Sequence, residues 1–454
     1  MINKSSLMLI LAFLTLQIKG HSQTRLDNYI QEGINNNTVL QQKQIDVEKA
    51  FLALDIARSN YLPTIQLSGT FSTAKGGRYS ELPIGDLMNP VYATLNQLTG
   101  SSSFPQIENQ QINFLPTNYY DVYVRTAVPI INTDIIYNKR IREQQQAVAQ
   151  LDLNCYARQL VNDIKVAYFN YLSAGEAALI YEKNLATLDR NIAFHEAMIR
   201  NGKGLNAQLL RAKSEWEAVN AKLTEARNQV LNAQYYFNFL LNKELNSPIE
   251  TEELTLDPAS STGSIAAREE LQMLEQAKTI QQTVLRMNEH YWVPKLNAFL
   301  DLGSQGVDWE VSSKSAYYMV GLSLSVPIFN GNRNTRQVKV AEWNLRESEI
   351  NIEQTKNQLS MAMQIAMNNL SSASANYTSA LRQQEAAEEY FKLIEKALLE
   401  GAATEIEFID ATNQLTQSEL QVNLMQQQVN CAIANLERET ASYPISLNSK
   451  TNPQ

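Results

Sequence analysis

The chain has 454 residues, a net charge of −9, and only 16 glycines, 12 prolines and 2 cysteines. Glutamine, asparagine, alanine and leucine are plentiful, a composition that suits long helices with polar faces better than an ordinary globular enzyme. The acidic balance and the lack of a basic cluster in the sequence argue against a nucleic-acid-binding protein.

The first residues predict a secretion signal. Lys4 is followed by an apolar run from Leu7 to Leu16 and then by Gly20-His21-Ser22. About ten apolar residues are too few to span a bilayer, so residues 1–22 are assigned to a signal peptide. Its removal takes away Lys4 and Lys19, and the net charge of −9 becomes −11. No cysteine follows, so a lipid anchor is not expected. No later segment has the apolar length of a membrane helix, so a membrane location would require strands.

Residues 23–255 are expected to begin with a helix up to about Asn60, followed by strands over residues 63–73 and 119–130. In the first strand apolar residues alternate with polar ones, as in a strand with one apolar face: Ile65, Leu67, Gly69 and Phe71. The segment Thr73–Asn118 is expected to be a long polar loop.

A long helix is then predicted over residues 133–201 and a return helix over residues 206–245, separated by Asn201-Gly202-Lys203-Gly204. In the long helix apolar residues alternate at spacings of four and three: Leu160, Ile164, Ala167, Tyr171, Ala174, Ala178 and Tyr181. This heptad pattern predicts left-handed coiled-coil packing.

Residues 256–440 repeat this order, and a tail follows over residues 441–454. The expected elements are a helix over 266–291, strands over 294–303 and 316–328, a long helix over 332–400 and a return helix over 404–438. The heptad recurs 199 positions later, at Leu359, Met363, Ala366, Leu370, Ala373, Tyr377 and Ala380, and Gly401 follows Gly202 by the same interval. The chain is therefore predicted to be a tandem structural repeat.

Prolines and turn residues mark the strand-to-helix junctions in both halves. Pro63 and Pro294 precede the first strand of each half, and Pro129 and Pro327 interrupt the second. Asn330-Gly331-Asn332 supplies turn chemistry before the second long helix. The aromatic residues just before the strands would suit either a membrane-surface belt or packing at a corner: Tyr61, Tyr291 and Trp292.

Lengths predict how the elements combine. A helix of about 70 residues is roughly 100 Å long, and the two shorter helices of each half together match it. Four strands cannot close a barrel, because about eight are needed, and open edges are excluded in lipid. Several chains must therefore share one barrel, and about three would supply twelve strands.

These features resemble the TolC-like family of outer membrane efflux proteins over nearly the whole mature chain. The resemblance rests on Ala127-Val128-Pro129-Ile130, on the segment 325–331 and on the turn 401–412. It implies an α+β membrane protein, a homotrimer with four strands per chain in a shared twelve-stranded transmembrane β-barrel and with long helices forming a periplasmic tunnel. Such proteins are outer-membrane exit ducts of tripartite efflux or type I secretion systems. They contact lipid, a periplasmic adaptor (membrane fusion protein) and an inner-membrane transporter of RND or ABC type, and they have no catalytic activity, metal or cofactor.

The resemblance also implies site residues at the two periplasmic tip turns, which contain Gly202, Gly204, Gly401 and Thr404. It places Glu407 and Asp410 as rings of acids at the tunnel entrance, and three-residue spacing puts both on one helix face. Alternatively, these acids only complement the helix dipole.

Four residues depart from the family's polar closing links: Ala207, Gln208, Leu398 and Ala403. Closure is therefore expected to rest on helix packing and on apolar contacts near Leu398 and Phe408.

Other residues are interpreted as ordinary side chains. His195 and His290 are too scattered for a metal or catalytic site, and Cys155 and Cys431 are expected to be helix-packed thiols. A secreted coiled-coil tether without a pore is the rival function. It would explain the heptads but not four one-sided strands with matched ends.

Overall fold

The computed structural model describes residues 25–115, 117–252 and 264–445. The expected signal peptide and the last part of the expected tail lie outside these ranges. The chain forms two compact units. We call the first, Met1–Phe51, Gln144–Thr279 and Arg346–Gln454, the helical unit, and the second, Leu52–Glu143 and Ile280–Leu345, the strand unit. Among the described residues, no helix is both long enough and apolar enough to cross a membrane.

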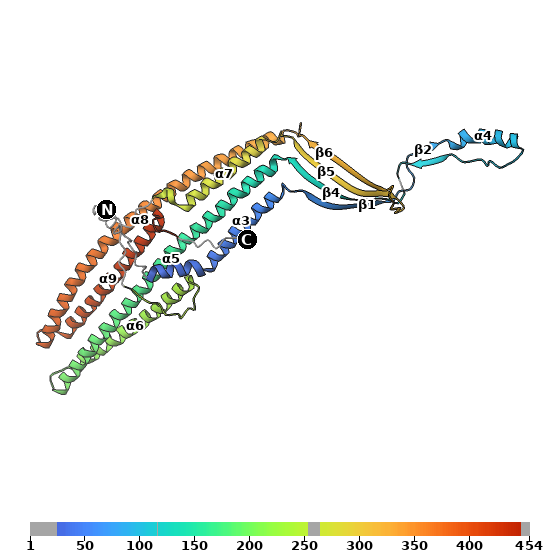
Figure 1. The fold of residues 1–454 in the computed structure, drawn as a ribbon. Helices are drawn as coiled ribbons and strands as arrows, with labels where there is room; N and C mark the ends of the chain where they lie inside the picture. The colour runs from blue at the N-terminus through green and yellow to red at the C-terminus, as the bar shows by residue number, and fades with distance from the viewer. Residues whose placement is uncertain (1–24, 116, 253–263, 446–454) are drawn as a thin grey trace, which may run out of the picture. The chain divides into compact units, whose positions relative to one another are not determined.

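The strand unit contains an antiparallel sheet in the order β1-β4-β5-β6 (Figure 1). Its strands are β1 (Thr64–Ser72), β4 (Tyr119–Ile131), β5 (Lys295–Val307) and β6 (Ala316–Ser325). β5 extends beyond the expected end at residue 303, because its ladder with β4 continues to Val307. β6 ends at Ser325, since Pro327 cannot donate a backbone hydrogen bond.

The register gives the sheet one apolar and one polar face. Leu67 lies opposite Val124, Val124 opposite Leu302, and Leu302 opposite Tyr318, so apolar residues line up across all four strands. On the other face Arg125 donates to both carboxylate oxygens of Asp301, at 2.8 and 2.7 Å. Because paired residues in adjacent strands share a face, the alternation in each strand becomes a property of the whole sheet.

The segment between β1 and β4 has its own structure, so the expectation of a plain polar loop at Thr73–Asn118 is wrong. It contains a hairpin of β2 (Tyr79–Leu82) and β3 (Gln110–Asn113), and the helix α4 (Ile84–Thr99). Pro90 lies inside α4 and concealed its helical spacing from sequence inspection.

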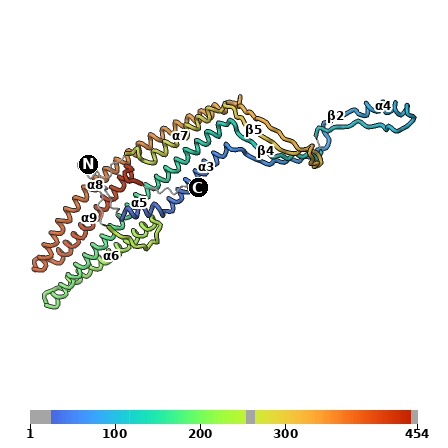
Figure 2. The backbone as a smooth tube through the Cα atoms, in the orientation of Figure 1, coloured from blue at the N-terminus to red at the C-terminus, as the bar shows by residue number. Residues whose placement is uncertain are grey.

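The helical unit is built from long antiparallel helices. α5 (Thr133–Arg200) runs beside α6 (Asn206–Leu240), and α8 (Arg333–Leu399) beside α9 (Glu405–Thr440) (Figure 2). The shorter helices are α2 (Arg25–Asn36), α3 (Thr38–Ser59) and α7 (Glu269–Glu289), the last preceded by the 3-10 turn η2 (Ile265–Ala267).

Two expected helices have different bounds. The helix expected before Asn60 is divided into α2 and α3 at Asn37, whose side-chain Oδ1 accepts from the N–H groups of Val39 and Leu40, and whose Nδ2 donates to the carbonyl of Leu240. α6 ends at Leu240 rather than at 245, because Asn242 adopts a left-handed φ of 55° and Lys243 N–H bonds the carbonyl of Asn238.

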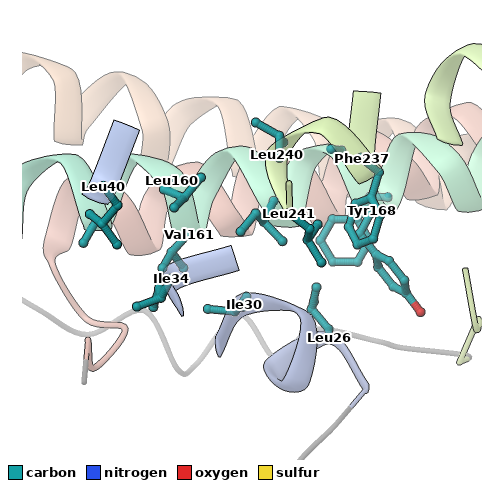
Figure 3. Close-up of a cluster of buried hydrophobic side chains, with 14 of the residues drawn as sticks. Leu26, Ile30, Ile34, Leu40, Leu160, Val161, Tyr168, Phe237, Leu240 and Leu241 are labelled. Atoms are coloured by element: carbon teal, nitrogen blue, oxygen red, sulfur yellow. The ribbon is translucent and has the colours of Figure 1, made fainter. Parts of the chain in front are cut away.

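The main apolar core surrounds this break (Figure 3). Ile30 and Leu40 from α2 and α3, Leu160 from α5 and Leu241 beyond α6 are all fully buried. A second cluster lies farther along α5 and α6 around Leu188 and Val219. The core therefore fixes the α5–α6 pair and the N-terminal helices as one packed body.

Candidate functional site

The two helix turns expected at the tips have the same backbone structure. Gly202 and Gly401 adopt left-handed φ angles of 70° and 76°. Each is followed by a residue whose N–H bonds a carbonyl five positions earlier, Lys203 to Met198 at 2.9 Å and Ala402 to Ala397 at 2.8 Å. This is the Schellman ending, which satisfies the last carbonyls of α5 and α8.

Gly204 is required for a different reason. A Cβ at this position would lie 2.8 Å from the backbone nitrogen of Ile199, so the chain passes too close to α5 for a side chain.

The helices that leave the two turns begin with different chemistry. At α9, the Thr404 hydroxyl accepts from the N–H of Glu407 at 3.3 Å, and one Glu407 carboxylate oxygen accepts from the N–H and the hydroxyl of Thr404 at 2.7 and 2.9 Å. These bonds hold the pKa of Glu407 below its usual value. At α6, Leu205 has no capping oxygen, and Gln208 accepts from its N–H only at 3.5 Å.

The two acids expected at the entrance are both exposed near the start of α9. Glu407 takes part in the helix cap and lies in the first turn of α9, a position compatible with either interpretation. Asp410 forms no ion pair with any described residue. The cap leaves the charge of Glu407 in place, so an acidic entrance ring stays a prediction.

Apolar packing at the second tip involves Phe408, which is buried, with its ring centroid 5.8 Å from that of Phe391. Leu398 is half-buried, and its carbonyl accepts the N–H of Gly401 at 3.0 Å. The role of these residues in closure stays a prediction.

Sequence inspection missed a polar seam between α5 and α9. His195 Nε2 lies 2.5 Å from Glu405 Oε2, which also accepts from Asn191 Nδ2 at 3.1 Å, and all three side chains are buried. About two turns from Asn191 along α5, Asn184 Nδ2 donates to Thr416 at 2.8 Å.

The seam continues toward the other end of the two helices, where Lys165 bonds Glu437 at 2.5 Å in a buried ion pair. We call the residues of these contacts the α5–α9 polar seam. Burying a charged pair costs desolvation free energy, and a shift of α5 along α9 would leave each buried charge without its partner. The seam therefore favours the observed alignment of α5 with α9. The alternating spacing of Asn184, Leu188, Asn191 and His195 was the available signal.

The junction prolines occupy three different settings. Pro63 and Pro294 stand directly before β1 and β5, and Pro327 lies beyond β6. Pro129, expected to interrupt its strand, lies within β4, which continues to Ile131 through a shift in register between the two residues.

Both cysteines are free and half-buried. Burial raises the pKa of Cys155 to about 12 and that of Cys431 to about 11, which disfavours the reactive thiolate. Within the described parts of the chain, no three His, Cys, Asp or Glu side chains are placed to hold a metal ion.

The sequence profile of the outer membrane efflux proteins matches residues 29–242 and 264–441. The chain belongs to the outer membrane efflux protein family. As a member of this family, it is an efflux protein of the outer membrane.

Individual relatives are distant. The nickel-cobalt-cadmium resistance protein NccC of Alcaligenes xylosoxydans xylosoxydans is 22% identical over 250 residues, which are 54% of this chain and 54% of that protein. The chain thus spans about half the length of NccC. The probable outer membrane lipoprotein SilC of Salmonella typhimurium is 20% identical over 407 residues, 86% of this chain and 80% of the relative. The outer-membrane channel OprN has a TM-score of 0.73 at 15% identity, covering 92% of this chain and 90% of OprN, which shows a shared fold.

Proposed function

We propose that this efflux protein is a homotrimeric exit duct, the outer-membrane component of a tripartite efflux or type I secretion system. The observation that best supports this function is the sheet with one continuous apolar face and two edge strands, β1 and β6, each of which leaves one side unpaired by any described strand. Exposed backbone groups and apolar side chains are both tolerated if strands of neighbouring copies close the sheet and lipid covers the apolar face.

In this arrangement β1 of one copy pairs with β6 of the next, and three copies give twelve strands. The polar face with the Arg125–Asp301 pair then lines the passage. The two hairpins, α5–α6 and α8–α9, act as tandem repeats whose copies form the periplasmic tunnel. The tunnel ends meet a periplasmic adaptor and, through it, an inner-membrane transporter of RND or ABC type.

The order of the elements gives the orientation. The β1–β4 connection, Thr73–Asn118, and the β5–β6 connection, residues 308–315, lie at the strand ends away from the helices and face outside the cell. Protease added to intact cells should therefore cut these connections. Cleavage at Gly202 or Gly401, with the connections protected, would show that the protein has the opposite orientation.

The main experiment is planar-bilayer conductance of the purified protein. A duct gives discrete channels, whereas the rival function, a secreted coiled-coil tether, gives none. The name of NccC supports metal ions as one cargo class to test, alongside other small molecules and proteins.

At the tunnel entrance, we assign Glu407 and Asp410 to a ring of acids. Fixed negative charges in a narrow passage concentrate cations, so a trivalent cation added on the periplasmic side should block current. The double variant Glu407→Gln with Asp410→Asn should relieve this block, and glutamine retains the capping geometry at 407. Asp46→Asn with Asp55→Asn removes the same charge from exposed positions of α3 and is the control. Equal block in both double variants would show that the acids lie away from the passage.

A further inference from the structure

The insertion between β1 and β4 holds its helix in a fixed orientation. Asn89 and Asn96 of α4 each form two hydrogen bonds with the backbone that returns to β3. Asn89 bonds the N–H and the carbonyl of Ile107 at 2.9 and 3.0 Å, and Asn96 bonds those of Phe104 at 3.1 and 2.8 Å. Residues seven apart share a helix face, so one face of α4 is bound to its own chain.

Close packing reinforces this attachment. A Cβ on Gly85 would lie 2.4 Å from the carbonyl oxygen of Ile107, so the first turn of α4 lies directly on the segment that leads to β3. The rings of Tyr92 and Phe104 are 5.6 Å apart. α4 is therefore an ordered helix with one face committed to the insertion.

The opposite face of α4 is apolar and uncovered. Leu87, Val91 and Leu98 are 69%, 49% and 78% exposed. At 3.6 residues per turn they lie about 180° around the helix from Asn89 and Asn96. We call these three residues the α4 stripe. Apolar side chains that lie next to one another and stay exposed in one chain are typical of an interaction site, whereas singly scattered ones are not.

We propose that the α4 stripes of the three copies pack against one another in the trimer. This inference rests on the proposed trimeric duct. Leu87, Val91, Thr94 and Leu98 follow the alternating spacing of a coiled-coil seam, which suits association with an identical helix. The insertion also begins at β1, the edge strand that in the trimer pairs with the neighbouring copy. Each copy therefore brings its own α4 stripe to a boundary that it shares with another copy.

Charge favours this partner over a lipid surface. Asp86 is the only charged residue among the 16 residues of α4, which contains no Lys or Arg. Helices that lie on membrane surfaces usually have basic residues on the polar face, and those residues attract anionic headgroups. An uncharged apolar stripe instead matches another uncharged apolar stripe.

Disulfide cross-linking tests the proposal in the full-length protein. Val91→Cys or Leu98→Cys is placed in a chain with Cys155 and Cys431 replaced by alanine. In a parallel threefold cluster equivalent residues meet at the same level, so mild oxidation should join copies efficiently. Ala93→Cys, also exposed but about 40° from Asn89, is the matched control and should give at least tenfold less product.

The trimer is scored independently by amine cross-linking of the unoxidised protein. An intact trimer with equal or no disulfide at positions 91 and 93 would overturn the α4 proposal and leave the duct proposal standing. Loss of the trimer in every variant and in the parent would overturn the duct proposal. Strong labelling of the α4 stripe by a photoreactive phospholipid would assign it to the bilayer and likewise overturn the proposal.

Discussion

The α5–α6 and α8–α9 hairpins have matching lengths and turns but differ in what their long helices bury. α5 buries large side chains, among them Leu160, Ile164, Phe169 and Leu188. In α8, all of whose residues are described, every buried residue is an alanine: Ala341, Ala366, Ala373, Ala380 and Ala387. α8 meanwhile leaves large apolar residues exposed, including Ile365 and Leu393.

This difference indicates which hairpin is complete within one chain. α5 is covered by α2, α3, α6 and α9 of its own chain. The last four buried alanines of α8 are seven residues apart, which gives a narrow seam for close helix approach. Outside that seam, Ile365 and Leu393 are left exposed by the described residues of the single chain. In the proposed trimer, neighbouring copies would cover them. α5 thus belongs to the core that folds within one chain, whereas α8 offers apolar surface for assembly with other copies.

The largest expected effect is in the core of α5. Ile164→Ala removes a fully buried side chain and should lower the free energy of unfolding by about 2–5 kcal/mol. Ile365→Ala on α8, where the side chain is about half exposed, should change it by less than about 0.5 kcal/mol in the dissociated chain. Urea unfolding in detergent, followed by helical circular dichroism, measures both. Equal losses would mean that α8 is as fully packed within the chain as α5.

The alanine seam of α8 should give a smaller loss. Ala380→Leu places extra volume where the side chain is buried, and should cost about 1–3 kcal/mol through overpacking. The same change at the exposed neighbour Ala375 is the control and should be nearly neutral. Thermal unfolding of the two variants compares them directly. If Ala380→Leu is also neutral, the seam is wide enough for larger residues and its spacing has no packing role.

The tip turns differ by one capping group. Thr404→Ala removes the hydroxyl that accepts the Glu407 N–H and should destabilise α9 by roughly 1 kcal/mol. Leu205→Thr places a hydroxyl at the same point of α6 and should stabilise it by a similar amount. Amide hydrogen exchange in the first turn of each helix reports the two effects separately. A Leu205→Thr variant with unchanged exchange would show that the extended N-cap geometry of α6 does not accept a cap.

Much of the fold follows from sequence periodicity, because alternation and heptad spacing reflect which side chains can share a face. The sequence also supports the α+β class and the family. It did not predict α4, since Pro90 and the short polar segments around it resemble a loop. It missed the division at Asn37 as well, because that side chain caps α3 only where the carbonyl of Leu240 is present to hold it.

The contacts of the candidate site were harder to predict from the sequence than the fold. Glycines at tight turns are visible, since a left-handed φ favours glycine. The His195–Glu405 contact joins residues 210 positions apart, so its recognition required the packing of α5 on α9. Isolated histidines give no such information. Acids and polar residues in a seam become interpretable only after the partner helix is known.

The smallest expected effect is a pH response confined to the second tip. Thr404 lowers the pKa of the exposed Glu407 carboxylate below its ordinary 4.5, so this cap contributes fully above pH 4.5 and is lost as pH falls through the lowered value. The equivalent Gln208 at α6 does not titrate. From about pH 6 to about pH 3, amide exchange corrected for its intrinsic pH dependence should therefore quicken in the first turn of α9 more than in that of α6. Glu407→Gln should abolish the difference while retaining the cap. The same acceleration in this variant would mean that the response arises in another carboxyl group, and that the two tips differ in sequence but not in their response to pH.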